Sequence, residues 1–235
     1  VFVEKPLCLT EEELQDIRST YEKQAAEGLH LMVGFNRRFS PHAKEARTFF
    51  SSRSNPLVML YRINAGRIPA DHWVQDPDVG GGRVIGEVCH FVDYMHALCA
   101  SPLTSVFASR VGRHSSGITE DQCSLSLTFG DGSIGTIIYT AEGSSALQKE
   151  HFEAHADGMS LVMSDFMETR TYHNGKSALF KTAKRDKGFA QEMAQFVQAI
   201  EQGLPPVIPF EQIDAVTRAC LLAVRSLSSG VAYPL

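Results

Sequence analysis

The stretch DQCSLSLTFGDGSIGTIIYTA, residues 121–141, decides the fold class of this 235-residue chain. Apolar and polar residues alternate on both sides of Asp131 and Gly132, which is typical of β-strands that bury one face. Asp-Gly is also a preferred pair for the tight turn of a β-hairpin. The stretch therefore predicts two antiparallel strands joined at Asp131 and Gly132.

Similar strand patterns lie on both sides of this hairpin. They are LVMLYRINA (57–65), SVFASRV (105–111), KEHFEAHA (149–156) and MSLVMSDF (159–166). Helical spacing of apolar residues is found near residues 41–52 and 83–99, and again in two closing segments, 189–200 and 213–227. Strands in one run with helices kept apart from them predict an α+β fold with a mainly antiparallel open sheet and helices packed on one side.

The first 35 residues follow a different pattern. A short apolar run at Val1 is followed by a capping box at Thr10 and Glu13, a helical pattern that stops at Gly28, and a second apolar run, residues 31–35. This order predicts a βαβ unit with two parallel strands. Polar residues follow each strand, at 4–5 and at 36–38, and ligands of parallel sheets bind beyond such strand ends.

The composition argues against several classes of partner. The chain is 43% hydrophobic and 21% charged with a net charge of −5, so nucleic acid is not expected as a partner. No run approaches the roughly 20 apolar residues of a membrane span, so no membrane is expected either. The five scattered cysteines form no CxxC pair, which predicts reduced thiols in a cytoplasmic protein rather than disulfides or a zinc site.

The helix pattern at residues 82–98, GRVIGEVCHFVDYMHAL, has two faces. A buried stripe is predicted for Ile85, Val88, Val92, Met95 and Cys99, whereas Arg83, Glu87, His90 and Asp93 share another face. Carboxylates three residues before and after His90 would favour its imidazolium form and fix its orientation. The alternative is a solvated helix face that carries a histidine by chance.

The loop at residues 66–82, GRIPADHWVQDPDVGGG, contains the only tryptophan, Trp73. Its length favours a substrate-facing loop, and the alternative is a loop that Trp73 merely pins to the surface. The three glycines at 80–82 could approach a phosphate, but a flexible turn is the preferred interpretation. His151 and His155 lie too far apart along a strand to share a metal ion, so no metal is expected.

Lys5 stands out because Pro6 restricts the direction in which it leaves its strand. A buried lysine beside a cationic ring would have a lowered pKa and could relay a proton near neutral pH. A salt bridge with Glu4 or with a carboxylate across the sheet is the alternative.

Taken in order, EKP (4–6), GFNRRF (34–39) and GGGRVIGEVCHFVD (80–93) resemble the glucose-fructose oxidoreductase and inositol dehydrogenase family of nicotinamide-dependent oxidoreductases. The resemblance implies that residues 1–38 are the C-terminal remnant of a dinucleotide-binding Rossmann domain. Residues 39–235 would then form an α+β domain for substrate binding and oligomerisation. The main NAD- or NADP-binding loop is expected upstream of Val1, so this chain alone is expected to be inactive.

The same resemblance implies roles for individual residues. Lys5 and His90 would be catalytic, with Glu87 standing in for an aspartate that the family usually has at the position of Gly86. Cofactor contacts are expected from Glu4, Lys5, Pro6 and Asn36, and substrate contacts from Arg38, Arg67, Trp73 and Asp93.

The expected reaction is hydride transfer between NAD or NADP and a secondary alcohol of a sugar, cyclitol or nucleotide sugar. A homo-oligomer formed through the open face of the sheet is also expected. Two alternatives stay open at this point. One is a redox-assisted glycoside lyase or hydrolase, and the other is a non-catalytic dimerisation or ligand-sensing domain of the same fold.

Overall fold

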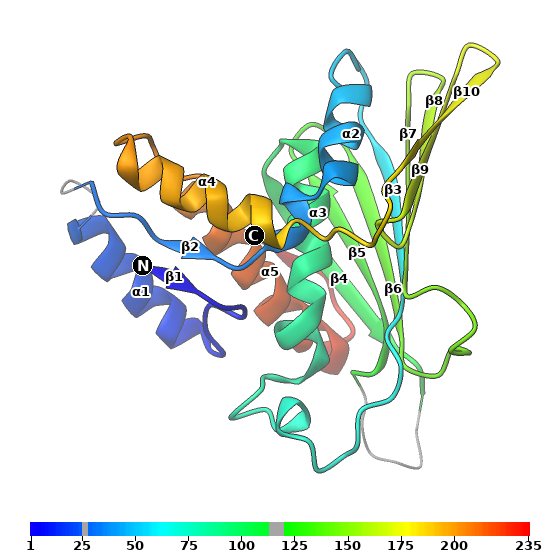
Figure 1. Ribbon diagram of the computed structural model, residues 1–235. Helices are drawn as coiled ribbons and strands as arrows, with labels where there is room; N and C mark the ends of the chain where they lie inside the picture. The colour runs from blue at the N-terminus through cyan, green and yellow to red at the C-terminus, as the bar shows by residue number, and fades with distance from the viewer. Residues whose placement is uncertain (25–27, 113–119) are drawn as a thin grey trace.

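The computed structural model describes residues 1–24, 28–112 and 120–235. One large sheet has helices on one face, and a smaller unit with the N-terminus lies on the far side of those helices (Figure 1). The predicted fold class, α+β with a mainly antiparallel open sheet and helices on one side, is confirmed.

The large sheet has nine strands in the order β10-β9-β8-β7-β3-β6-β5-β4-β11. Their bounds are β3 Val58–Asn64, β4 Leu103–Arg110, β5 Gln122–Phe129, β6 Ile134–Thr140, β7 Glu150–Ala156, β8 Met159–Ser164, β9 Glu168–His173, β10 Lys176–Lys181 and β11 Tyr233–Pro234. All neighbours pair antiparallel except β3 and β6, which are parallel.

The hairpin at Asp131 and Gly132 forms as its sequence predicts. Leu125 of β5 lies opposite Ile137 of β6, and both side chains are fully buried. The position of β3 between β6 and β7 has no counterpart in the sequence patterns, because β3 pairs with strands that lie far along the chain. The inner face of this sheet therefore forms one side of the core.

Two helices supply the other side of that core. They are α3 (Cys89–Cys99) and α5 (Phe210–Ser229), which contact each other and lie between the large sheet and the N-terminal unit (Figure 1). The predicted stripe of Ile85, Val88, Val92, Met95 and Cys99 is buried. Helix α2 (Pro41–Phe49) lies on the same side of the large sheet as α3, toward the top of the view in Figure 1.

Helix α4 (Phe189–Glu201) is amphipathic as expected, but much of its apolar stripe stays exposed. Phe189 is 63% exposed and Ile200 is 51% exposed. Phe196 is the member that turns inward, and its ring lies 5.5 Å from that of Phe2. The helix therefore contacts the N-terminal unit through one side only.

The N-terminal unit confirms the predicted parallel pairing. Strand β1 (Phe2–Val3) pairs with β2 (Met32–Val33), and α1 (Glu11–Gln24) connects them. The capping box is formed, with the backbone N–H of Glu13 donating to Thr10 Oγ1 at 3.1 Å. A part-buried ion pair, Arg18 with Asp214 at 2.6 Å, fastens α1 to α5 and so positions the unit.

Candidate active site

Helix α3 begins with a π-helical turn, Val84–Val88, before its regular part. Such turns are rare and frequently lie at functional sites. Gly86 lies within this turn, and a Cβ atom there would approach the backbone oxygen of Gly80 to 2.9 Å. Gly86, where the resemblance implies an aspartate, therefore has no room for a side chain in this conformation.

Lys5 contacts this turn directly. Its Nζ donates to the backbone oxygen of Gly86 at 2.7 Å, across 81 residues of sequence. Gly86 lies one turn before His90, so the EKP motif and the histidine helix come together at the end of β1. The alternative salt bridge with Glu4 is not formed, since Glu4 is exposed and its carboxylate lies against Gly34.

His90 is buried, with 6% of its surface exposed. Its Nδ1 has no hydrogen-bond partner. Burial, and then the nearby cations Arg37 and Lys5, hold the pKa of the imidazole well below its ordinary value. The prediction of an imidazolium supported by two carboxylates is therefore wrong, and so is the solvated-face alternative.

Glu87 points to other partners than His90. It accepts hydrogen bonds from the Lys149 ammonium at 2.7 Å and the Tyr139 hydroxyl at 2.5 Å, and it lies 3.3 Å from Arg83. Burial raises the pKa of this carboxyl, but Lys149, Tyr139 and Arg83 outweigh it, so the pKa is lowered. Glu87 is thus a charged group that positions Lys149.

Asp93 and Arg38 bind each other. Arg38 donates to both oxygens of Asp93, at 3.0 and 2.5 Å, and also to Gln212 Oε1 at 2.9 Å. Both residues are buried. This arrangement argues against the substrate-binding role expected for them, because the carboxylate and the guanidinium are already occupied in joining α3, α5 and the short 3-10 helix Asn36–Phe39.

Sequence reasoning missed a buried network around Glu150. This carboxylate is 0% exposed and accepts from Arg37 Nε and Nη2, both at 2.9 Å, from the Tyr61 hydroxyl at 2.8 Å and from Lys187 Nζ at 2.5 Å. Burial raises the pKa of Glu150, but Arg37 and Lys187 bring it down to about 2. The only indication of this network in the sequence is the pair of adjacent arginines in GFNRRF. Nothing in the sequence indicates that Arg37 pairs with Glu150, which lies 113 residues away.

The remaining cofactor candidates lie at the ends of β1 and β2. Asn36 is 1% exposed, and its amide donates to the backbone oxygen of Lys187 at 2.8 Å. Pro6 is half-buried directly after Lys5. Glu4, Lys5 and Pro6 therefore keep accessible surface at the strand end, whereas the Asn36 side chain is committed to the Lys187 segment.

The substrate candidates of the 66–82 loop lie at the surface. Trp73 is 61% exposed with the His72 ring 5.7 Å away, and Arg67 pairs with Glu142 at 2.5 Å. No described contact joins either residue to Lys5 or His90. Gly80 packs so closely that a Cβ atom would lie 2.5 Å from the backbone oxygen of Trp73, which makes the glycines a packed turn rather than a phosphate cradle.

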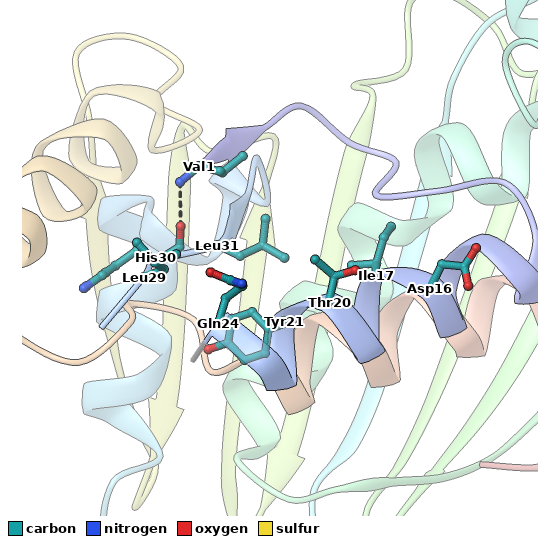
Figure 2. Close-up of a pocket in the computed structure, with 9 residues that line it drawn as sticks. All are labelled: Val1, Asp16, Ile17, Thr20, Tyr21, Gln24, Leu29, His30 and Leu31. Carbon is teal, nitrogen blue, oxygen red and sulfur yellow. Dashed lines mark hydrogen bonds between the residues drawn. The ribbon is translucent and has the colours of Figure 1, made fainter. Parts of the chain in front are cut away.

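Two hollows bear on the question of ligands. One of about 370 Å³ is lined by Val1, by side chains of α1 and by residues 29–31 (Figure 2), and neither Lys5 nor His90 lines it. Another of about 490 Å³ is lined by Lys149 together with Asn64, Asp165 and Arg185. Neither Lys5 nor His90 lines the second hollow either, but Lys149 connects it to the His90 helix through its contact with Glu87.

Within residues 1–24, 28–112 and 120–235, no group of three or more His, Cys, Asp or Glu side chains could hold a metal ion. His151 and His155 both lie near the Glu153 carboxylate instead, at 2.8 and 3.7 Å. In the same ranges no helix combines the length and the apolar character needed to cross a membrane.

Comparison with known proteins agrees with this fold. Residues 56–161, somewhat less than half of the chain, match the sequence model of the GFO/IDH/MocA C-terminal domain, so this part of the chain is similar to that domain. An uncharacterized oxidoreductase, YrbE of Bacillus subtilis (strain 168), is 27% identical over 141 residues, which is 58% of this chain and 40% of that protein's length.

Solved structures share the fold over the whole chain. An NAD binding oxidoreductase from Klebsiella pneumoniae superposes with a TM-score of 0.83 at 18% identity, covering 100% of this chain and 73% of that one. GenD2 from gentamicin A biosynthesis in complex with NAD gives 0.78 at 19%, covering 100% and 71%. The aldose-aldose oxidoreductase of Caulobacter crescentus gives 0.80 at 16%, covering 100% and 72%. At such identities the likeness establishes the fold alone.

Proposed function

We propose that this chain is part of an oxidoreductase that transfers hydride between NAD or NADP and a secondary alcohol of a sugar, cyclitol or nucleotide sugar. The observation that carries the proposal is the 2.7 Å contact of Lys5 Nζ with Gly86, one turn before the buried His90. An ammonium donor and a neutral imidazole are thereby held at the end of a parallel strand. The oxidoreductase relative and the shared fold support the same class.

A nicotinamide fits this position by the chemistry of the donor set. Glu4, Lys5 and Pro6 would hold it, because they follow β1 at the strand end where ligands of parallel sheets bind. When bound, the nicotinamide supplies the site that accepts or releases the hydride.

The proton chemistry follows from the two side chains. A neutral His90 can accept the hydroxyl proton of the substrate, because the low pKa leaves its ring unprotonated at neutral pH. Lys5 would donate a hydrogen bond to the same substrate oxygen. The cations that keep the imidazole neutral also favour negative charge on that oxygen as the proton leaves.

Substitution of the two residues in the intact protein tests this assignment. We expect Lys5→Met and His90→Gln each to lower kcat by on the order of 10²-fold or more, the usual effect of a positioned acid-base group. Glutamine is chosen because His90 is buried and a smaller residue would leave a cavity. His173→Gln, at an exposed position, is the matched control.

Glu87→Gln separates two roles within the same assay. A shift of the pH-rate profile would make Glu87 a proton carrier. A lower kcat/KM with an unchanged profile would show that it only positions Lys149, which is the expected result. Normal turnover of His90→Gln across the pH range would show that His90 is not the base that accepts the substrate proton. That result would contradict the proposed function.

A further inference from the structure

The chain that follows β2 lies against the His90 ring. The Phe35 ring is 6.4 Å from that of His90, in an edge-to-face arrangement. Asn36, the next residue, donates from its amide to the backbone oxygen of Lys187 at 2.8 Å. The segment that carries Lys187 is therefore fixed close to the histidine helix, although the two are distant in the sequence.

Residues 182–188, which join β10 to α4, hold the backbone of Lys187 in place. Gly188 has a φ of +88°, and a Cβ atom there would collide with the backbone of Asn36. The backbone N–H of Gly188 also donates to Asp186 Oδ1 at 2.9 Å. These contacts do not use the Lys187 side chain, so its substitution should leave the segment where it is.

The Lys187 side chain belongs to the Glu150 network. Its Nζ donates to Glu150 Oε1 at 2.5 Å, and the same carboxylate accepts from Arg37 Nε and Nη2, both at 2.9 Å. Glu150 is ionised at neutral pH, because its pKa is about 2. Burial lowers the pKa of Lys187, and the Glu150 carboxylate acts against this effect. Two cations thus share one carboxylate, and the cluster retains one positive charge.

Charged groups from the other elements around His90 do not cancel this charge. They are Glu4 and Lys5 at the end of β1, Arg83, Glu87 and Asp93 on the histidine helix, Lys149 before β7 and Glu192 on α4. The acids of the histidine helix are already paired, with Lys149 and with Arg38. Burial, followed by Glu4, raises the pKa of Glu192 to about 8, so this acid is largely protonated at neutral pH. Glu4 itself is exposed, and screening weakens its effect. The Cys220 thiol on α5 stays protonated, because burial raises its pKa.

The retained charge affects the ability of His90 to act as a base. Burial, followed by Arg37, Lys5 and Lys187, holds the pKa of its imidazole well below the ordinary value. A cation near a buried imidazole disfavours the imidazolium, so the ring stays free to accept a proton at neutral pH. Among these cations, Lys187 can be removed with the least damage, because Glu150 would keep its other hydrogen bonds.

We propose that Lys187 is a positioning residue of the candidate active site, whose ammonium, held by Glu150, keeps the His90 ring unprotonated so that the ring can accept the substrate proton. This inference rests on the proposed function, because it takes His90 as the base. In the part of the chain that the structure describes, the Lys187 ammonium donates to Glu150 and not to the His90 ring. Lys187 therefore acts through its charge, and the charge is the property to test.

Titration of the His90 ring by NMR in the intact protein, without cofactor or substrate, tests the inference. The His90 signal is identified by its loss in His90→Gln. In Lys187→Met, the pH at which the ring is half protonated should rise by about one unit, the usual effect of removing a neighbouring charge. Lys187→Arg, which keeps the charge, should leave this pH unchanged. Lys184→Met, at an exposed position of the same segment, should also leave it unchanged.

Lys187→Gln serves in place of Lys187→Met if the latter does not fold, because an amide can still donate to Glu150 without carrying a charge. An unchanged His90 titration in the uncharged variant would overturn the inference, and so would an equal rise in Lys187→Arg or Lys184→Met. Turnover is measured separately. Normal turnover of His90→Gln contradicts the proposed function, whereas an unchanged titration in Lys187→Met rejects this inference alone.

Discussion

Burial shifts the pKa values of two residues in opposite directions, lowering that of His90 and raising that of Glu192. His90 is held neutral because its imidazolium would be buried among cations, and Glu192 is held largely neutral because its carboxylate would be buried near Glu4 and Asp93. Both residues are less than one-tenth exposed. The neutral form of neither residue could be predicted from its neighbours in the sequence. For His90, the flanking carboxylates even favoured the charged form.

The free energy of unfolding should depend on pH because of Glu192. Its pKa in the folded chain, about 8, lies above the ordinary 4.5, so the folded state keeps a proton that the unfolded state releases. The free energy of unfolding therefore falls as pH rises from about 4.5 to about 8. Glu192→Gln should raise the melting temperature at pH 8 more than at pH 5, by an amount equivalent to roughly 1–3 kcal/mol.

The matched control is Glu201→Gln, at the exposed end of α4. It should leave the melting temperature unchanged at both pH values. Scanning calorimetry across the pH range checks the two variants together. A parallel curve for Glu192→Gln and the unsubstituted chain would show that Glu192 is ionised in the fold.

The two adjacent arginines of the 3-10 helix Asn36–Phe39 bind different partners. Arg37 pairs with Glu150 at the start of β7, and Arg38 pairs with Asp93 on α3. This short element thus joins the end of β2 to the large sheet and to the histidine helix. It sets where Lys5 and His90 meet, although neither arginine contacts them by hydrogen bond.

The Glu150 network should be a major contributor to stability. Glu150→Gln leaves Arg37 and Lys187 buried without their carboxylate, and breaking such a pair costs about 3–5 kcal/mol. Urea unfolding should show this loss in the midpoint. Glu142→Gln, which breaks the exposed pair with Arg67, should change stability by about 1 kcal/mol or less. Similar losses in the two variants would contradict the prediction.

The outer face of the large sheet presents exposed apolar side chains. Phe107, Ile134, Ile138 and Val58 are 38%, 49%, 42% and 52% exposed, and Val58 lies directly opposite Ile134. We expect self-association through this face, because exposed apolar patches of a sheet mark interaction sites. Ile138→Lys should weaken association measured by light scattering at about tens of micromolar.

Leu204→Lys serves as the comparison, since Leu204 is exposed to a similar degree outside the sheet. It should leave association unchanged. A monomer for the unsubstituted chain at these concentrations, or equal weakening by both substitutions, would refute an interface on the outer face.

The polypeptide of residues 1–235 should not bind NAD or NADP at about micromolar concentration, because a switch-point crevice needs more strands than β1 and β2. The glycine spacing at residues 130–135, GDGSIG, resembles a dinucleotide-binding fingerprint, but it forms the hairpin between β5 and β6 rather than a turn into a helix. Micromolar binding in a calorimetric titration would reject this expectation.

The elements that could be predicted from the sequence are those whose signals are local. Alternation around Asp131 and Gly132 predicted the hairpin, Thr10 and Glu13 predicted the start of α1, and the 3-4 spacing predicted the buried stripe of α3. These signals suffice because strand period, capping and helix period are properties of neighbouring residues. They also brought Lys5 and His90 forward as candidates.

The partners of the charged residues could not be predicted from the sequence, because they are brought together by the folded chain. Glu87 was expected beside His90 and lies with Lys149, and Arg38 and Asp93 were expected at the substrate and bind each other. Glu150 was not foreseen at all. Burial, charge pairing and the π turn at Gly86 depend on residues far along the chain, and no local period carries that information.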